Sequence, residues 1–399
     1  MPTPLAPDPR NPAFYANPFA AYARFHAECP TFHWDAYGHR CFAGHKDVSG
    51  LLRDRRLGRQ RTPWDPPPPR IGLEAFDTLE RHSMLELEPP AHTKLRTAVN
   101  RSFVSRSLAD MEPFVRRRAT ELVDALPDAA SFDLLPAFAT PLPVETIATL
   151  LGVPLAMTDR MLSWSHDMVA IYAFANDEGV ERRANDAAGE FTAFIRGELG
   201  RANEGSLLAK LAANPNLSTD DAVATAILLL NAGHEATVHQ IGNAVRALID
   251  ARDSGLDLGW WVADDERLER LVEECLRFAP PLHLFTRYAY EDISWTDATG
   301  GTIEIARNDT IGLLLGAANR DPRAFADPDR FDPTRERIDH VAFGGGIHFC
   351  LGAPLARMEL RIALRTLFAR YPKLKLAYEP VVADTFHFHG LERLVVTTG

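Results

Sequence analysis

The cysteine at position 350 has the surroundings of a reactive or metal-binding thiol. It lies in Phe343-Gly-Gly-Gly-Ile-His-Phe-Cys350-Leu-Gly-Ala-Pro-Leu-Ala-Arg357, a glycine-rich loop directly before a predicted helix. The positive end of that helix and the nearby backbone N–H groups favour the thiolate over the thiol. The glycines at 344–346 and Gly352 let the backbone approach a flat ligand, and Phe343 and Phe349 offer apolar cover. A buried structural cysteine is the alternative interpretation.

A second candidate for chemistry is an acidic residue near the middle of a long predicted helix, in Ala232-Gly-His-Glu235-Ala236-Thr237. Residues 227–230 are apolar on all faces, so this helix should cross the interior. Gly233 costs about 1 kcal/mol relative to alanine and indicates a close approach or a local distortion. Glu235 is a candidate for proton transfer. The alternative is that Glu235 only pairs with a nearby cation, while His234 or His239 faces solvent.

Four basic side chains could neutralise the carboxylates of a buried ligand. His92 and Arg96 lie on one helix face at i,i+4 spacing. Arg287 follows the Pro280-Pro281 break on an extended segment, and His348 lies two residues before Cys350. Buried carboxylates need cationic or hydrogen-bonding partners of this kind. Taken singly, each residue fits an ordinary polar position equally well.

The loop around Cys350 resembles the haem-binding signature of the cytochrome P450 family, F-x-x-G-x-H-x-C-x-G-x-x-L-A-R, at every defined position. Glu274-Cys-Leu-Arg277 is similar to the family's E-x-x-R motif, and Pro328-Asp-Arg330-Phe331 to the segment that supplies a third charged member. The resemblance implies haem b (iron protoporphyrin IX), with Cys350 as the axial ligand to the iron. It also implies a buried network of Glu274, Arg277 and Arg330 below the haem.

The resemblance implies roles for the other candidates as well. His92, Arg96, Arg287 and His348 would bind the haem propionates, Phe343 and Gly352 would flank the thiolate, and Gly233 would help to open a groove for O2. The family usually has an acid followed directly by threonine, whereas Ala236 follows Glu235 here and Thr237 comes one place later. A helix turns about 100° per residue, so Thr237 cannot simply replace the missing hydroxyl. A substrate hydroxyl or ordered water, with Glu235 and Thr237, is the hypothesis for the proton relay.

The elements that would position these residues are mostly helical. A hairpin is expected at 31–35 and 40–43, a helix at 45–53 and an irregular, substrate-covering loop at 61–90. Helices are predicted through most of 91–251, and the clearest starts at Ser218 in a capping box with Asp221 and runs about 30 residues. Further predictions are a helix at 264–278, strands at 292–295 and 302–305, a helix at 310–317, turns at 321–340 and a helix at 354–371. The fold class is mostly α with a small β portion, a single-domain cytochrome P450 fold over residues 1–399.

Bulk properties exclude several classes of protein. The net charge of -11 argues against nucleic-acid binding, and the four scattered cysteines fit neither a disulfide framework nor a zinc site. No apolar stretch approaches the roughly 18 residues of a membrane span, and the N-terminus resembles no signal peptide. A cytoplasmic location is therefore expected.

The substrate expected from this sequence is a small to mid-sized, largely apolar organic molecule. Candidate pocket residues are Trp64, Phe76, Met84, 168–174, 282–285 and 386–388, with His283, His387 and His389 among them or close by. Because there is no fused redox module, electrons should come from a separate ferredoxin and NAD(P)H-dependent reductase. Arg357, Arg361 and Arg365, with Lys94 and Arg101, could form its basic docking patch, although a solvated arginine face is equally consistent.

Three functions are compatible with these residues. The first is a monooxygenase that activates O2, and the second is a haem-thiolate binding or sensor protein without turnover. Atypical chemistry is a variant of the first, because Ala236 replaces the usual threonine. The third makes Cys350 a nucleophile, but His348 at i−2 is poorly placed to be its base.

Overall fold

The computed structural model describes residues 6–61, 70–104, 108–127, 131–172, 174 and 177–398. Its helices are α1 Pro12–Ala16, α2 Phe19–Glu28, α3 His45–Leu51, α4 Glu74–Glu80, α5 Ala91–Asn100, α7 Glu112–Asp124, α8 Pro141–Leu151, α9 Thr158–Val169, α10 Glu178–Leu199, α11 Leu207–Ala212, α12 Thr219–Asp253, α13 Leu258–Ala263, α14 Asp265–Phe278, α15 Leu315–Ala318 and α16 Ala353–Arg370. Its strands are β1 Thr31–Trp34, β2 His39–Phe42, β3 Leu57–Gly58, β4 Ser131–Asp133, β5 Phe285–Ala289, β6 Ile293–Thr296, β7 Thr302–Ile305, β8 Thr310–Leu313, β9 Lys375–Leu376, β10 Val381–Val382, β11 Leu391–Arg393 and β12 Val395–Thr397. The predicted class, mostly α with a small β portion, is confirmed.

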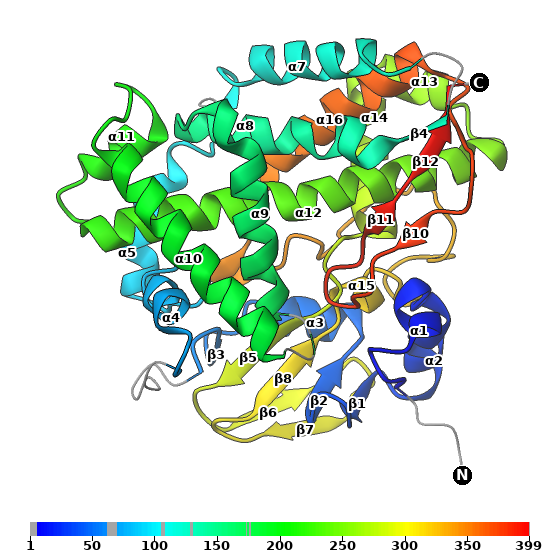
Figure 1. Cartoon of the computed structure of the whole chain (residues 1–399). Helices are drawn as coiled ribbons and strands as arrows, with labels where there is room; N and C mark the ends of the chain where they lie inside the picture. The colour runs from blue at the N-terminus through cyan, green and yellow to red at the C-terminus, as the bar shows by residue number, and fades with distance from the viewer. Residues whose placement is uncertain are drawn as a thin grey trace.

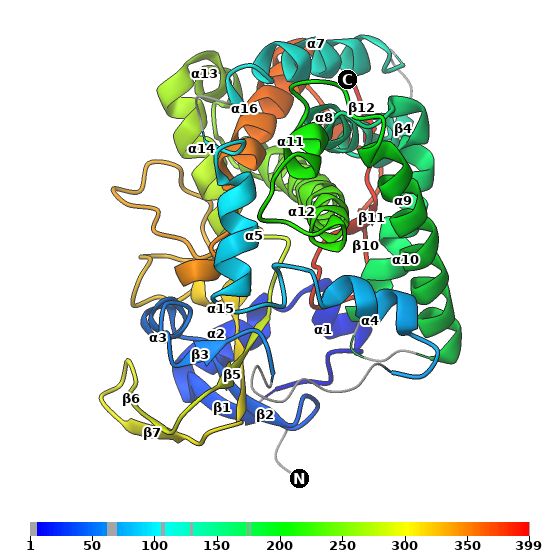
Figure 2. The ribbon, with the colours of Figure 1, turned by 90° about the vertical axis from the view of Figure 1, so that its left-hand side faces the viewer.

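Helix α12 crosses the centre of the molecule, and Figure 2 views it nearly along its axis. Its capping box forms as predicted: the Asp221 N–H donates to Ser218 Oγ at 3.0 Å, and the Ser218 N–H donates to Asp221 Oδ2 at 3.1 Å. The helix is 35 residues long and packs against α8, α10, α14 and α16. Because neighbours cover it on several sides, its first half can be apolar all round.

The main sheet and the β6–β7 pair gather at one end of the molecule, opposite α7, whereas β4, β10, β11 and β12 lie apart from them (Figure 1). The main sheet has the order β1-β2-β8-β5-β3, and the β1–β2 hairpin and the β6–β7 pair lie where they were predicted. The helix predicted at 310–317 is wrong. Residues Thr310–Leu313 form β8, parallel to β2 and antiparallel to β5, and only Leu315–Ala318 is helical. A short apolar run fits either element, and here the pairing across the sheet decides.

The stretch 61–90 is less irregular than predicted, because it contains α4. Phe76 and Leu79 of that helix are buried, and α4 packs against α10. Trp64, one of the expected pocket residues, lies outside the described residues. Among the described residues, none of the helices combines the length and the apolar character that crossing a bilayer requires.

The side of the molecule that carries Cys350, called the proximal side below, is built from α14, the long loop after α15, and α16. Glu274 and Arg277 on α14 are fully buried and form a bidentate ion pair, with both N–O distances at 2.7 Å. The third charged member is Arg335, whose Nε lies 3.4 Å from Glu274 Oε1. Arg330, the predicted third member, has a side chain that is 68% exposed and contributes only its carbonyl, which accepts from Arg277. The motif does not specify the path of this loop, and that path places Arg335 rather than Arg330 beside Glu274.

Candidate functional site

The Cys350 loop is held by its own backbone and by two left-handed glycines. The Cys350 N–H donates to the Phe343 carbonyl at 3.0 Å, and α16 begins three residues later with Gly352 as its N-cap. Gly344 and Gly346 have φ values of 70° and 68°, which favour glycine. A Cβ on Gly346 would lie 2.5 Å from the Leu52 carbonyl oxygen, so no other residue fits there without backbone movement.

Two opposing effects act on the pKa of the Cys350 thiol. Burial raises its pKa, while the N–H groups of Gly352 and Ala353 and the charge of Arg96 act to lower it. The N–H groups of the loop and of the start of α16 thus act in the predicted direction, towards the thiolate, although burial is the larger effect. Coordination of a metal ion would favour the ionised sulfur further.

Three of the four predicted basic residues meet beside this loop. The rings of His92 and His348 lie 4.6 Å apart between their centroids, and Arg96 donates to the Phe349 carbonyl at 2.7 Å. Burial lowers the pKa of His92 to about 4, with help from the charges of His348 and Arg96, so its imidazole is neutral. These two contacts join α5 to the cysteine loop. The i,i+4 spacing places His92 and Arg96 on the helix face that makes them.

Arg287 is a buried cation without an acidic partner among the described residues. It is 3% exposed, sits on β5, and its guanidinium donates only to the adjacent Thr286 carbonyl, at 2.9 Å. Burial lowers its pKa to about 10. A buried guanidinium that keeps its charge calls for an anion, so this position suits a carboxylate of a bound ligand.

Sequence reasoning missed two residues of this cluster, Glu88 and Arg59. Glu88 Oε1 lies 2.9 Å from His348 Nε2 and accepts from the Arg59 N–H at 2.7 Å. Burial acts to raise the pKa of Glu88, but these hydrogen bonds outweigh it and lower the pKa. Glu88 precedes His92 by one helical turn, a spacing that could have identified it.

The central turn of α12 presents small residues to accessible space. Ala232 is exposed and Ala236, one turn later, is partly exposed, although the helix runs through the interior. Gly233 faces elsewhere: a Cβ there would lie 2.8 Å from Ile147 of α8, so the glycine permits helix packing. The Thr237 hydroxyl lies 3.4 Å from the Gly233 carbonyl and donates back to its own helix.

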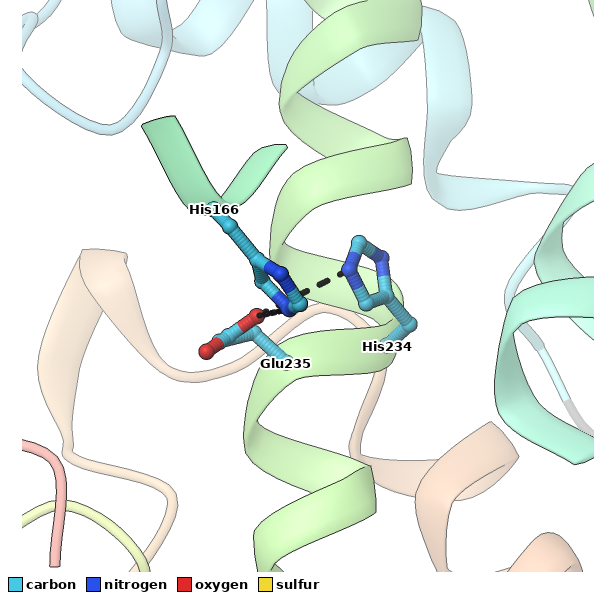
Figure 3. Close-up of side chains that lie close together, drawn as sticks. All are labelled: His166, His234 and Glu235. Atoms are coloured by element: carbon cyan, nitrogen blue, oxygen red, sulfur yellow. Dashed lines mark ion pairs between the residues drawn. The ribbon is translucent and has the colours of Figure 1, made fainter. Parts of the chain in front are cut away.

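Glu235 lies among three histidines (Figure 3 shows two of them). Its carboxylate oxygens are 3.6 Å from His166 Nε2, 3.7 Å from His234 Nε2 and 3.5 Å from His239 Nε2. Burial acts to raise the pKa of Glu235, but the His239 hydrogen bond and the charges of His234 and His166 lower it to about 2. The alternative in which His234 or His239 faces solvent is wrong, because His234 is buried and the side chain of His239 is only 16% exposed.

Comparison with known proteins identifies the family of this chain. A sequence model described as Cytochrome P450 matches residues 266–385. The vitamin D(3) 25-hydroxylase of Pseudonocardia autotrophica is 35% identical over 97% of this chain and 95% of its own. The chain belongs to the cytochrome P450 family. The biotin biosynthesis cytochrome P450 of Bacillus subtilis is 32% identical over 96% of this chain and 97% of its own.

A solved structure agrees with this assignment. P450BioI in complex with hexadec-9Z-enoic acid ligated acyl carrier protein matches with a TM-score of 0.88 and 30% identity, over 96% of this chain and 99% of that chain. This cytochrome P450 is therefore an oxidoreductase with haem b as its cofactor. The residues present fit that group. Arg287 has no anionic partner in the described part of the chain, so it could bind a propionate. Gly346 allows close packing of the cysteine loop, and α12 has an accessible face of small residues.

The structure bears differently on two expectations about the surroundings of this P450 site. His283 and His389 are buried in the core, where they stack 4.5 Å apart and His283 is 2.6 Å from the Tyr22 hydroxyl, so the expectation that they line the substrate pocket is wrong. The basic docking patch on α16 stays a prediction, but its charges are partly compensated within the chain. Its arginines face carboxylates of α14, in the pairs Arg357–Glu273 at 2.6 Å, Arg361–Glu269 at 3.1 Å and Arg365–Asp265 at 2.6 Å. Lys94 likewise pairs with Asp221.

Proposed function

We propose that this cytochrome P450 binds haem b through the thiolate of Cys350 and oxidises a mid-sized, largely apolar organic substrate. The observation that supports this best is Arg287, a buried guanidinium without an acidic partner in the described part of the chain. The charge of Glu88 acts on the pKa of Arg287, and Glu88 also contacts His348, two residues before Cys350. A flat ligand bearing carboxylates would satisfy Arg287 and place its metal at the sulfur.

Each residue of the site has a defined task in this proposal. Arg287, His92, Arg96 and His348 bind the propionates, and the loop from Phe343 to Gly352 holds the sulfur at the start of α16. When bound, haem supplies the iron at which O2 is activated. The two arginines would compensate the propionate charges, and His92, as a neutral imidazole, would donate a hydrogen bond to them.

Proton delivery must work without a hydroxyl at position 236. Glu235 is ionised near neutral pH because the neighbouring histidines lower its pKa, so its carboxylate can accept a hydrogen bond from a proton donor of the relay. The Thr237 hydroxyl already donates to the Gly233 carbonyl. We therefore assign the missing hydrogen-bonding group to a substrate hydroxyl or to ordered water beside Ala236.

The Ala236→Thr variant tests this assignment. If a substrate hydroxyl serves the relay, the added side chain leaves coupling of NADH oxidation to product unchanged or lowers it, because it occupies the space of that group. A variant that binds substrate normally and couples much better would contradict the assignment. Ala232→Ser, one turn away on the accessible face, is the matched control.

The substrate class rests on chemistry and on the relatives. One relative is named for hydroxylation of vitamin D(3), and one structure carries a hexadecenoic acid on an acyl carrier protein. Both ligands are long and apolar with few polar groups. We infer a substrate of similar character for this chain, with electrons from a separate ferredoxin and its NAD(P)H-dependent reductase.

The test is an absorption titration of the ferric holoprotein with sterols, terpenes, fatty acids, macrolides and aromatics. The proposal predicts a shift towards high spin with one apolar class, because the ligand displaces water from the iron. Ferredoxin, reductase and NADH should then yield an oxygenated product of that ligand. A purified protein without a haem band, or a haem protein that oxidises none of these ligands, would contradict it.

A further inference from the structure

We propose that His166, His234 and Glu235 form a binding site for a divalent transition-metal ion. The site is separate from Cys350 and from the propionate-binding residues. It joins α9, which carries His166, to the centre of α12, which carries His234 and Glu235 (Figure 3). The proposal does not depend on the substrate or on the redox partner.

The donor atoms already converge. His166 Nε2 and His234 Nε2 lie 3.6 and 3.7 Å from Glu235 Oε2, and one ligand atom from each of the three residues lies within 4.8 Å of the others. Zinc binds histidine nitrogen and carboxylate oxygen at about 2.0–2.2 Å, so its ligand atoms are separated by at most about 4.2 Å. A small rotation of His166, whose side chain is 61% exposed, closes that gap.

His234 provides an independent indication that a cation belongs there. Its Nδ1 is 2.6 Å from the Leu230 carbonyl, which can only accept, so Nδ1 carries the proton. The neutral ring then directs the Nε2 lone pair towards the Glu235 carboxylate, another acceptor. His234 is 3% exposed, and Nε2 has no hydrogen-bond partner. A proton, a water molecule or a metal ion between the two acceptors removes this conflict.

The geometry of His234 favours a metal ion. A metal-binding histidine commonly donates its other ring N–H to a backbone carbonyl, which is the arrangement that His234 has with Leu230. The tautomer required for coordination is therefore already set.

The site has access to a cavity. His166 and His239 both line a cavity of about 580 Å³ that also contacts Thr140 and Glu145. His239 Nε2 lies 3.5 Å from Glu235 Oε1, the other carboxylate oxygen, so it is a neighbour of the three converging donors rather than one of them. An ion and a water ligand could reach the site through this cavity.

The ligand set selects the class of ion. Imidazole nitrogens suit Zn²⁺, Ni²⁺ and Co²⁺, whereas Mg²⁺ and Ca²⁺ prefer oxygen ligands. A bound ion would fix α9 on α12 and occupy the Glu235 carboxylate. If Glu235 serves proton transfer as proposed above, occupancy would also slow turnover, but binding itself can be measured without turnover.

The test is calorimetric titration of the chelator-treated ferric holoprotein, without an affinity tag, with ZnCl₂. We expect one Zn²⁺ per chain at micromolar affinity or tighter, and no comparable binding of Mg²⁺. His166→Ala should weaken Zn²⁺ binding at least about tenfold, whereas His33→Ala, an exposed histidine on β1, should leave it unchanged.

His166 and His33 are both exposed, so both variants should fold, and an unchanged haem spectrum verifies this. His234→Ala, with its buried position, serves as a second variant and should also weaken binding. Absence of Zn²⁺ binding to the unmodified holoprotein would overturn the proposal. Equal affinities in His166→Ala and His33→Ala would overturn it as well, because the ion would then bind elsewhere.

Discussion

Two buried polar regions of this cytochrome P450 differ: the network of Glu274 and Arg277 on the proximal side, and the central part of α12. Arg277 donates to both Glu274 oxygens and to the carbonyls of Asn319, Pro328 and Arg330. In the described part of the chain, the central part of α12 contains buried polar atoms that lack hydrogen-bond partners: Asn231 Oδ1, His234 Nε2, His239 Nδ1 and Gln240 Oε1.

This difference separates scaffold from site. A fully satisfied buried network fixes one geometry, and here it fixes the base on which the cysteine loop and α16 rest. Unpartnered buried atoms carry a cost that a ligand, ion or water can remove. The central part of α12 can thus bind a ligand, an ion or water reversibly, whereas the network of Glu274 and Arg277 keeps one fixed geometry.

The largest expected effect is the loss of the proximal network. Arg277→Ala removes the bidentate partner of buried Glu274 and leaves it only the longer contact with Arg335, so the free energy of unfolding should fall by about 3–5 kcal/mol. Denaturant unfolding of the haem-loaded protein measures it. Arg117→Ala, whose exposed side chain is 3.8 Å from Glu121, should change stability by less than about 0.5 kcal/mol. Equal losses in the two variants would remove the contrast between the network and the surface.

The next effect concerns the central part of α12 and should appear in the rate of turnover. Glu235→Gln removes a proton-transfer group, so turnover should fall by about 10²-fold while the haem spectrum stays nearly unchanged. Product formation with the redox partners measures the change. Glu178→Gln, an exposed residue at the start of α10, is the control. A variant of Glu235 that unfolds readily but turns over normally would assign this residue to the scaffold instead.

The smallest effect distinguishes two arginines of one loop. Arg335→Ala should destabilise the protein by about 1–3 kcal/mol, because its side chain is 8% exposed and contacts buried Glu274. Arg330→Ala should cost less than about 0.5 kcal/mol, because only its carbonyl joins the network. Thermal unfolding of both variants gives the comparison. The reverse order would restore Arg330 as the third member.

Much of the fold was predictable where local signals are strong. The capping box at Ser218 and the prolines after Phe278 mark helix ends through interactions between near neighbours in sequence. Residues Thr310–Leu313 were mistaken for a helix because their state depends on β2 and β5, which are distant in sequence. Local pattern alone cannot report such pairing.

The same limit applies to the site. The spacing of His92 and Arg96 and the glycines before Cys350 follow from short motifs. The four-residue spacing of the α16 arginines was visible, but their partners on α14 depend on how the two helices pack. His166 comes to Glu235 from another helix, so no spacing in the sequence could identify their contact.

The central claim is that Cys350 binds the haem iron, and the ferrous carbon monoxide spectrum tests it most directly. We predict that the unmodified protein and Cys29→Ser, a change at an exposed cysteine, give the spectrum of thiolate-ligated haem. Cys350→Ser should lose that spectrum, with or without loss of haem. Retention of the thiolate spectrum in Cys350→Ser would contradict the account, because another cysteine would then be the ligand.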